Sequence, residues 1–471
     1  MLRISSCRLL FMVMRCADGA GRFGKGMVNF MGKAGRLAEN VKRACGYCKR
    51  NGPAAAVSAI AERLLEQRED YVYQPPVEAE CRRQRRAAQE WKDAPLLSVV
   101  VPAYETKEAF LKDLLDCMQD QTWPFWELII ADGSESDKVA QAVEERGEER
   151  IRYVKLEENR GIAENTNEAI RLARGEYIGL LDHDDILTPD ALYRMAHALR
   201  EKRKQGIFPL FLYSDEDKCS QDGKTFFSPH RKLDFNLDLL FSNNYVCHFL
   251  MMEAGLIKDL MLRPGYDGAQ DYDLVLRAAG RMMEIGREDV CVHVYGILYH
   301  WRCHSASTAS NPDSKDYAYE AGKRALEDFA AARGWEAQVS HTKHLGFYRM
   351  EFGSGLFAQR RDVGAVAAPL PSRGGNLMSG IYDRADGGIR MRYAGLRKGF
   401  SGRFHRAALC QDVEAADIRS MQVRPEWEEA FQKALFSLRS GGDPAEISLE
   451  FCAKIRERGQ RILWDPCRRD G

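Results

Sequence analysis

The chain has 471 residues, of which 45% are hydrophobic, and its 69 basic side chains are balanced by 69 acidic ones. This length predicts about two or three domains. The balanced charge excludes a chain-wide basic surface, so we expect no nucleic acid partner. The 13 cysteines are scattered singly, which favours reduced thiols and a cytoplasmic protein. We expect neither a secretory signal nor a membrane span, because no apolar run approaches roughly 18 to 20 residues.

Residues 1–94 are predicted to form a helical appendage with basic faces. Lysines and arginines recur among apolar residues at Lys33, Arg36, Lys42, Arg43, Lys49, Arg50, Arg63 and Arg68. Such faces fit peripheral contact with an anionic membrane surface, or a partner. A solvated helical hairpin packed on the main domain is the alternative. Pro75-Pro76 ends this region, and a charged helix from Glu78 to Lys92 follows it.

Residues 95–345 are predicted to form an α/β domain. Four apolar runs of strand length, 96–101, 126–131, 151–156 and 177–181, alternate with segments of helical periodicity. Short crossovers of this kind predict a mostly parallel sheet whose strands end on one edge, where ligands bind. Acidic residues follow three of the four runs: Glu105, Asp132 and the cluster Asp182–Asp185.

The pattern changes after Asp185. A strand over 210–213 is expected to end at Ser214–Asp217, and residues 245–252 alternate like a further strand. Gln270-Asp271 begins a helix. The run 292–299 predicts a strand that ends in His300 to His304, and an amphipathic helix over 317–333 closes the domain.

The cluster Asp182-His183-Asp184-Asp185 directly follows the buried run 177–181. Carboxylates this close repel one another, and a metal or cationic ligand is the usual compensation. The alternative is a solvated loop before a helix capped by Thr188. A metal held by Asp184, with help from His304 or His300, would have oxygen and imidazole ligands, which favours Mn²⁺ or Mg²⁺.

A bound metal would neutralise a diphosphate, and neighbouring residues suit the rest of a nucleotide. Asp132 can accept from a base N–H, and Tyr104 can stack on a ring. Arg160 and Arg302 can pair with phosphates. Asp271, at the first turn of its helix, could activate an acceptor hydroxyl for direct displacement with inversion. The alternative for Asp271 is an acid that favours the helix dipole.

With these pieces placed, the region from about Ser98 to Ala309 resembles the inverting family 2 glycosyltransferases of bacteria, which have a Rossmann-like GT-A fold. The matching segments are Ser-Val-Val-Val-Pro-Ala-Tyr-Glu (98–105), Ala-Asp-Gly-Ser (131–134), Asn-Arg-Gly-Ile-Ala-Glu-Asn-Thr-Asn (159–167), Leu-Asp-His-Asp-Asp (181–185), Gln-Asp-Tyr-Asp-Leu (270–274) and Tyr-His-Trp-Arg-Cys-His-Ser-Ala-Ser (299–307). The N-terminal appendage is similar to that of polysaccharide-assembly members.

The resemblance implies a nucleotide-sugar donor, a divalent metal and a role for each matching residue. It implies Asp132 on the nucleobase, Asp182 on the nucleotide and Asp184 on the metal. It also implies Asp271 as general base and His304 as a metal ligand on a closing loop. The other residues expected at the nucleotide-sugar site are Pro102, Ala103, Tyr104, Glu105, Arg160, Gly161, His183, Gln270 and Arg302. The family usually has Glu-Asp where this chain has Gln270-Asp271, so the base is kept while its neighbour is neutral.

Residues 346–471 are similar to the second half of another such domain, without a nucleotide-binding first half. A strand over 363–370, a helix over 447–458 and a strand over 461–464 carry this similarity. Glu446 falls where Asp271 does, and Ser448 replaces the following acid. We expect a degenerate acceptor-side or packing module and no second active site.

The function expected from these features is metal-assisted, inverting sugar transfer. A uridine or deoxythymidine diphosphate donor is favoured, because an acid that accepts from a base N–H suits a pyrimidine imide. By family analogy the acceptor would be a glycan or lipid-linked glycan of a cell-envelope polysaccharide. One alternative is a phosphoesterase or nucleotidyltransferase that bridges two ions with Asp182, Asp184 and Asp185. Another is a catalytically silent glycan- or nucleotide-binding module on the same fold.

Overall fold

The structure, a computed structural model, describes residues 27–65, 70–304, 316–353, 355–371, 378–385 and 387–468, with backbone alone for 27–43, 371, 378 and 379. The chain divides into two compact units, residues 1–65 and 66–471. Arg68 and the end of the motif at 305–307 lie outside the described residues.

The first unit contains helix α2 (Met27–Leu65), which confirms the predicted N-terminal helix. Gly52 has a non-helical φ of 82° and is followed by Pro53, so the element consists of two helical pieces. Proline lacks the N–H that would continue the hydrogen-bond ladder, which explains the break. Among the described residues, no helix is both long and apolar enough to span a membrane.

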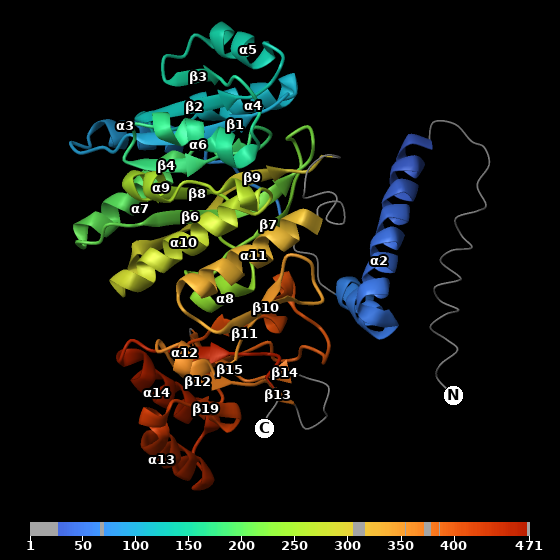
Figure 1. The fold of residues 1–471 in the computed structure, drawn as a ribbon, viewed down its shortest axis with the longest axis vertical. Helices are drawn as coiled ribbons and strands as arrows, with labels where there is room; N and C mark the ends of the chain where they lie inside the picture. Colours follow the sequence, from blue (N-terminus) through green and yellow to red (C-terminus); the bar gives the residue numbers. More distant parts are fainter. Residues whose placement is uncertain are drawn as a thin grey trace. The chain divides into compact units, whose positions relative to one another are not determined.

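A mixed sheet with strand order β3-β2-β1-β4-β8-β6-β9-β5 is the centre of the second unit (Figure 1). Its strands are β1 (Leu97–Ala103), β2 (Trp126–Asp132), β3 (Ile151–Lys155), β4 (Tyr177–Leu180), β5 (Ile186–Leu187), β6 (Phe211–Cys219), β7 (Phe226–His230), which pairs with β6, β8 (Leu250–Glu253) and β9 (Cys291–Arg302). The first four are parallel, as predicted, whereas β8 runs antiparallel to β4 and to β6. The predicted α/β class is confirmed.

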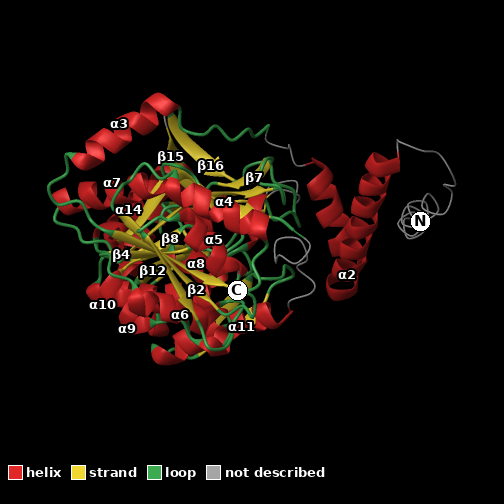
Figure 2. Ribbon diagram, turned by 90° about the horizontal axis from the view of Figure 1, so that it is seen from above, coloured by secondary structure: helices red, strands yellow, loops and turns green. Residues whose placement is uncertain are grey.

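Helices cover both faces of this sheet, and Figure 2 shows strands in the interior with helices around them. The helices are α3 (Glu78–Gln89), α4 (Glu108–Gln119), α5 (Lys138–Arg146), α6 (Ile162–Leu172), α7 (Ala191–Lys204), α8 (Leu237–Ser242), α9 (Ala254–Leu260), α10 (Gln270–Ile285) and α11 (Asp316–Ala332). Successive strand residues point to opposite faces. Val100 therefore packs in the core with α6 and α10, whereas Val99 and Val101 pack in the core with α4 and α7.

Two strand predictions were wrong in ways that affect the site. Strand β6 continues through Asp215, Glu216 and Asp217, where the predicted strand was expected to end, and these acids are buried. Residues 245–249, expected in a strand, have no regular structure, and β8 begins only at Leu250. Cys247 there has a φ of 26°, which a regular strand does not allow.

The C-terminal part has its own small sheets, seen in red and orange in Figure 1. Its elements are β10 (Ala337–His341), β11 (Tyr348–Phe352), α12 (Leu356–Gln359), β12 (Val363–Ala367), β13 (Leu370–Pro371), β14 (Met378–Ser379), β15 (Ile381–Ala385), β16 (Gly388–Arg392), β17 (Gln411–Asp412), β18 (Ala415–Ala416), β19 (Met421–Val423), α13 (Glu428–Arg439), α14 (Pro444–Glu457) and β20 (Arg461–Trp464). Strand β12 pairs in parallel with β20, which follows α14 directly. The predicted strand, helix and strand are confirmed as elements, while their origin as a degenerate repeat stays a prediction.

Two histidines stack on each other within the C-terminal part. The rings of His344 and His405 lie 3.6 Å apart between centroids. Burial, with the charges of His405 and Lys343, lowers the pKa of His344 to about 3. Burial, with the charge of Lys343, lowers the pKa of His405 to about 4. Both rings are therefore neutral in the folded protein at neutral pH.

These histidines should make the protein sensitive to mild acid. An unfolded histidine has a pKa of about 6.5, so below that pH the unfolded chain binds more protons. Their stabilising contribution is present above about pH 6.5 and is lost as the pH falls toward 4. We expect His405→Asn to reduce the acid-induced loss of unfolding free energy by about 1–2 kcal/mol between about pH 7.5 and about pH 5, measured by urea denaturation. Asparagine tolerates the φ of 58° at this position. His197→Asn, at an exposed position of α7, should leave that loss unchanged.

Candidate functional site

The acids that follow β4 occupy different environments although they are adjacent in sequence. Asp185 is buried, and it accepts hydrogen bonds from the Tyr299 hydroxyl at 2.5 Å and from the Arg302 backbone N–H at 2.7 Å. Burial and the charges of Asp184 and Asp182 raise its pKa well above the ordinary range. Asp185 thus ties the end of β4 to β9, and its oxygens are already engaged.

Asp184 lies beside the histidine that the sequence placed with it. His304 Nε2 is 2.6 Å from Asp184 Oδ2, and the ring of Phe110 packs 5.2 Å from the His304 ring. The alternative ligand, His300, is buried, and its Nδ1 lies 2.5 Å from the Asp217 carboxylate. Of the two histidines considered, the structure brings His304 to Asp184.

A second group that could hold a metal lies in the same cluster. One ligand atom each from Asp182, Asp185 and His248 lies within 4.8 Å of the others. Burial raises the pKa of Asp182; the His248 charge acts against this, while the charges of Asp184 and Asp271 raise it further. Carboxylates held together in this way favour a bound cation, and oxygen with imidazole donors fits Mn²⁺ or Mg²⁺. Sequence reasoning missed His248, because residues 245–252 were expected to form a regular strand.

Asp271, in the first turn of α10, faces the irregular segment 244–249. Its Oδ2 accepts a hydrogen bond from Asn244 Nδ2 at 2.7 Å and lies 3.5 Å from the Cys247 sulfur. Burial and the Asp271 charge raise the Cys247 pKa well above the ordinary range, so this sulfur is a neutral thiol donor. His248 of the same segment lies with Asp182 and Asp185, so segment 244–249 connects the predicted base to the strand-end acids.

The ends of β1 and β2 form the opposite side of the site. Asp132 is fully buried, and its carboxylate accepts from the Ser134 backbone N–H at 2.9 Å and from the Tyr153 hydroxyl at 2.9 Å. Pro102 and Ala103 lie beside it at the end of β1. Tyr104 follows with 48% of its surface exposed, so its ring is available for stacking.

Glu105 is exposed and has a φ of 43°, a left-handed conformation that is uncommon for residues other than glycine. Its carboxylate accepts from the backbone N–H groups of Glu135 at 3.0 Å and Ser136 at 3.2 Å. These hydrogen bonds lower its pKa. Glu105 therefore fixes the loop after β2. The Thr106 hydroxyl lies 2.6 Å from His183 Nδ1, and this contact links the ends of β1 and β4.

The remaining predicted residues lie around the N-termini of α6 and α10. Arg160 is exposed, and its guanidinium donates to Glu168 at 3.0 Å. Gly161 has a φ of 93°, and a Cβ there would meet the Asp267 carboxylate at 2.5 Å, so a side chain would be excluded. Gln270 Oε1 accepts from a backbone N–H two residues earlier at 2.7 Å.

The structure places Arg302 away from the expected phosphate position. Its side chain is buried, and it donates to the Asp184 carbonyl at 2.5 Å, to the Gln221 carbonyl at 2.8 Å and to the Asp113 carboxylate at 2.9 Å. A guanidinium with these partners has no side open to a ligand. Arg302 instead supports the backbone of the Asp184 loop.

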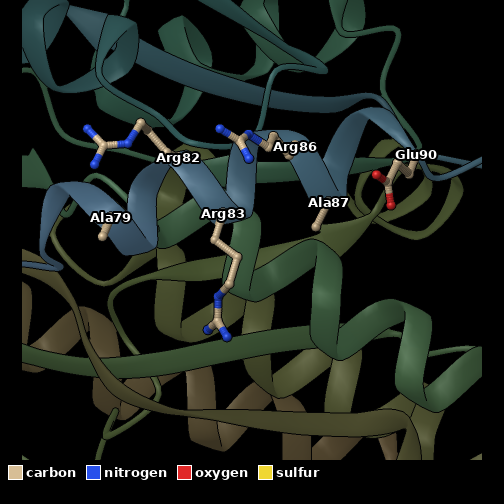
Figure 3. A pocket seen from close by; sticks show the side chains of 6 residues that line it. All are labelled: Ala79, Arg82, Arg83, Arg86, Ala87 and Glu90. Carbon is tan, nitrogen blue, oxygen red and sulfur yellow. The ribbon is translucent and has the colours of Figure 1, made fainter.

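A separate hollow of about 400 Å³ lies on α3 and shares no residue with this cluster (Figure 3). It is lined by Ala79, Arg82, Arg83, Arg86, Ala87 and Glu90. Arg83 pairs with Glu80 at 2.6 Å and Arg82 with Glu78 at 3.4 Å, within one helical turn. Pairs at this spacing are typical of a solvated helix face.

Comparisons with known proteins show what this region is similar to. The family described as "Glycosyl transferase family 2" matches residues 98–260. A protein of Sinorhizobium fredii, "Uncharacterized protein y4gI", is 37% identical over 244 residues, which are 51% of this chain and 26% of that protein. The O-antigen biosynthesis protein RfbC of Myxococcus xanthus is 35% identical over 250 residues, 52% of this chain and 19% of RfbC. This chain thus spans about a quarter of the first relative and about a fifth of the second.

Among solved structures, S. aureus TarS 1–349 in complex with UDP-GlcNAc is 18% identical, with a TM-score of 0.38, over 50% of this chain and 66% of that one. A likeness of this degree carries no argument about function. The family match rests on the sequence of β1 to α9, which contains every strand of the large sheet except β9. Residues 98–260 of this chain are therefore similar to glycosyltransferase family 2.

Proposed function

We propose that the protein transfers a sugar from a nucleoside diphosphate sugar to an acceptor hydroxyl, with inversion at the anomeric carbon. One observation carries this proposal: segment 244–249 contacts Asp271 through Asn244 and Cys247 and brings His248 to Asp182 and Asp185, so a base and a candidate cation site lie together. A direct displacement needs both, because the acceptor loses a proton while the leaving diphosphate gains charge. The match of residues 98–260 to glycosyltransferase family 2 supports the same reaction class.

We assign the divalent ion, Mn²⁺ or Mg²⁺, to Asp184 with His304, and the nucleotide contact to Asp182. Asp185 is the weaker ligand, because Tyr299 and the Arg302 backbone already donate to it. When bound, the ion would stabilise the charge of the departing diphosphate. The paired Asp184 and His304 atoms, 2.6 Å apart, offer the hard oxygen and imidazole donors that such an ion accepts.

In this proposal Asp271 accepts the proton of the acceptor hydroxyl. The hydroxyl oxygen then forms its bond to the anomeric carbon as the bond to the diphosphate oxygen breaks on the opposite face, which inverts the configuration. Asn244 and Cys247, which contact Oδ2 of Asp271, restrict its carboxylate to one orientation. Holding the base in one orientation favours proton transfer because fewer unproductive arrangements are populated.

The nucleotide would lie along the ends of β1, β2 and β4. Carboxylate oxygens can accept more than one hydrogen bond, so Asp132 can still accept from a base N–H. Tyr104 would stack on the base, and Arg160 would exchange Glu168 for a phosphate. The residues Pro102, Ala103, Glu105, Gly161, His183 and Gln270 would shape the surrounding wall. Among nucleoside diphosphate sugar donors, one with a pyrimidine base suits Asp132 best.

For the acceptor, we propose a glycan or lipid-linked glycan of a cell-envelope polysaccharide. The relative RfbC is named as an O-antigen biosynthesis protein, which supports this class. The basic residues of α2 would then contact the anionic inner face of the membrane from the cytoplasm. The C-terminal part would be a degenerate half-domain on the acceptor side. The two-ion phosphoesterase alternative is disfavoured, because Asp185 is engaged by protein donors.

A thermal-shift titration tests the proposal. Uridine, deoxythymidine, guanosine and cytidine diphosphates would be added with and without Mn²⁺. A ligand that prefers the native state should stabilise it by about 2.7 kcal/mol at a hundredfold excess over its dissociation constant. We expect such a shift for one diphosphate, and only with metal. If a folded protein shows no shift with any of the four, the transferase proposal fails and the silent binding module becomes the better account.

A further inference from the structure

The C-terminal part packs on residues 229–242 of the main domain. Asn236 and Asp412 exchange two hydrogen bonds, from Asn236 Nδ2 to the Asp412 carbonyl at 2.8 Å and from the Asp412 N–H to Asn236 Oδ1 at 3.0 Å. Arg360 donates to both carboxylate oxygens of Asp238 at 2.7 and 2.9 Å, with both side chains buried. These contacts fix the path of the chain that precedes and includes α8.

A short segment of the C-terminal part, Arg403–Arg406, contacts the start of this stretch. Arg403 donates to the Pro229 carbonyl at 3.0 Å, and Arg406 donates to the Arg231 carbonyl at 2.9 Å. Between them, the ring of Phe404 lies 4.1 Å from the His230 ring. Phe404 has a φ of 54°, an uncommon conformation that persists only when its surroundings hold it.

The next residue of the stretch, Lys232, connects these contacts to the site. Its ammonium group is fully buried and lies 3.2 Å from the Glu216 carboxylate. It also donates to the carbonyls of Val246, at 2.7 Å, and His248. An ammonium has three protons, so these three partners use all of its donors.

The two carbonyls belong to the irregular segment 244–249, whose side chains surround the proposed base and acids. Asn244 and Cys247 contact Asp271, and His248 lies with Asp182. A segment without ladder hydrogen bonds needs other partners to hold one conformation. Lys232 supplies two of them.

We propose that Lys232 is a positioning residue for segment 244–249, and that Arg403–Arg406 of the C-terminal part hold Lys232 in place. The C-terminal part then sets the orientation of Asp271 indirectly. Arg403–Arg406 hold Lys232, and Lys232 holds segment 244–249, which contacts Asp271. The inference rests on the proposed function only where it names Asp271 as the base, and its structural claim can be tested without a substrate.

The first experiment measures amide hydrogen exchange in the full chain carrying Arg403→Gln and Arg406→Gln. We expect residues 244–249 to exchange roughly tenfold faster, because hydrogen bonds donated by charged groups are lost and local opening increases. N-ethylmaleimide should also modify Cys247 faster, read out by peptide mass spectrometry. A second variant with Arg406→Lys in place of Arg406→Gln keeps a hydrogen-bond donor at this position. It should restore part of the protection of residues 244–249 from exchange.

The matched control is Arg419→Gln, which removes an arginine that pairs with Asp417 at 2.6 Å within the C-terminal part. It should leave exchange at 244–249 unchanged. Faster exchange at 229–232 without any change at 244–249 would overturn the proposal. An equal rise over every element of the chain would also overturn it, since that indicates general destabilisation alone.

The second experiment uses Lys232→Met combined with Glu216→Gln, which removes both buried charges together so that neither remains unpaired. We expect this variant to fold, to exchange rapidly at 244–249 and to bind the diphosphate with Mn²⁺ as before. Its kcat for sugar transfer should fall, and the dependence of kcat on pH should change shape, because Asp271 is held less firmly. Slow exchange at 244–249 in this folded variant would refute the role of Lys232. If the exchange results hold but the wild-type protein transfers no sugar, the positioning role stands and the proposed function fails.

Discussion

Asp271→Asn should reduce the kcat of sugar transfer by about 100- to 10,000-fold, the range expected when a general base is removed. Asparagine has nearly the same shape, and its side-chain oxygen can still accept from Asn244, which lies 2.7 Å from the carboxylate. It cannot take a proton from the acceptor hydroxyl at neutral pH. Donor binding, measured by thermal shift with the diphosphate and Mn²⁺, should change little.

The matched control for this variant is Glu284→Gln on the same helix. Glu284 is exposed near the C-terminal end of α10, so the change removes one carboxylate from that helix without altering the site. We expect wild-type kinetics for it. Transfer by Asp271→Asn at more than about a tenth of the wild-type rate would remove Asp271 from the role of base.

Asp184→Asn should abolish the dependence of nucleotide binding on metal and lower kcat/KM for transfer by about a hundredfold or more. The reason is that a metal carboxylate ligand contributes charge, which a neutral amide does not, and metal stabilisation of a leaving group is worth several kcal/mol. The Mn²⁺-dependent thermal shift should disappear. Removal of metal from the wild-type protein with a chelator should give the same loss, and added Mn²⁺ should reverse it.

Asp185→Asn distinguishes a metal ligand from a structural acid in the same cluster. Asp185 accepts hydrogen bonds from the Tyr299 hydroxyl and from the Arg302 backbone N–H. In Asp185→Asn, the side-chain NH₂ group would face one of these two buried donors, which would then lack an acceptor. We expect this variant to lose about 1–3 kcal/mol of unfolding free energy. If Asp184→Asn keeps its metal response while Asp185→Asn loses it without a loss of stability, the ion belongs with Asp182, Asp185 and His248.

The positions of the strand-end acids followed from sequence because they depend on short-range rules. Apolar runs separated by helical segments predict parallel strands that end on one edge. In the structure Asp132 ends β2 and Asp182 follows β4, and both strands pair in parallel with β1, which lies between them. The same rules indicated that Asp271 begins a helix, which α10 confirms. The proximity of Asp184 and His304 depended on a motif, and the structure places these two side chains 2.6 Å apart.

What the sequence alone determined is therefore the α/β class, the first four strands with their parallel direction and which acids follow them, since periodicity reports how each residue relates to its chain neighbours. Only the tertiary structure decided that Arg302 is buried behind Asp184, and that segment 244–249 leaves the strand conformation to contact Asp271. It also decided that Lys232, from another part of the chain, holds this segment by its carbonyls. These outcomes depend on contacts between residues far apart in sequence and on which buried polar groups find partners there, and no local pattern contains that information.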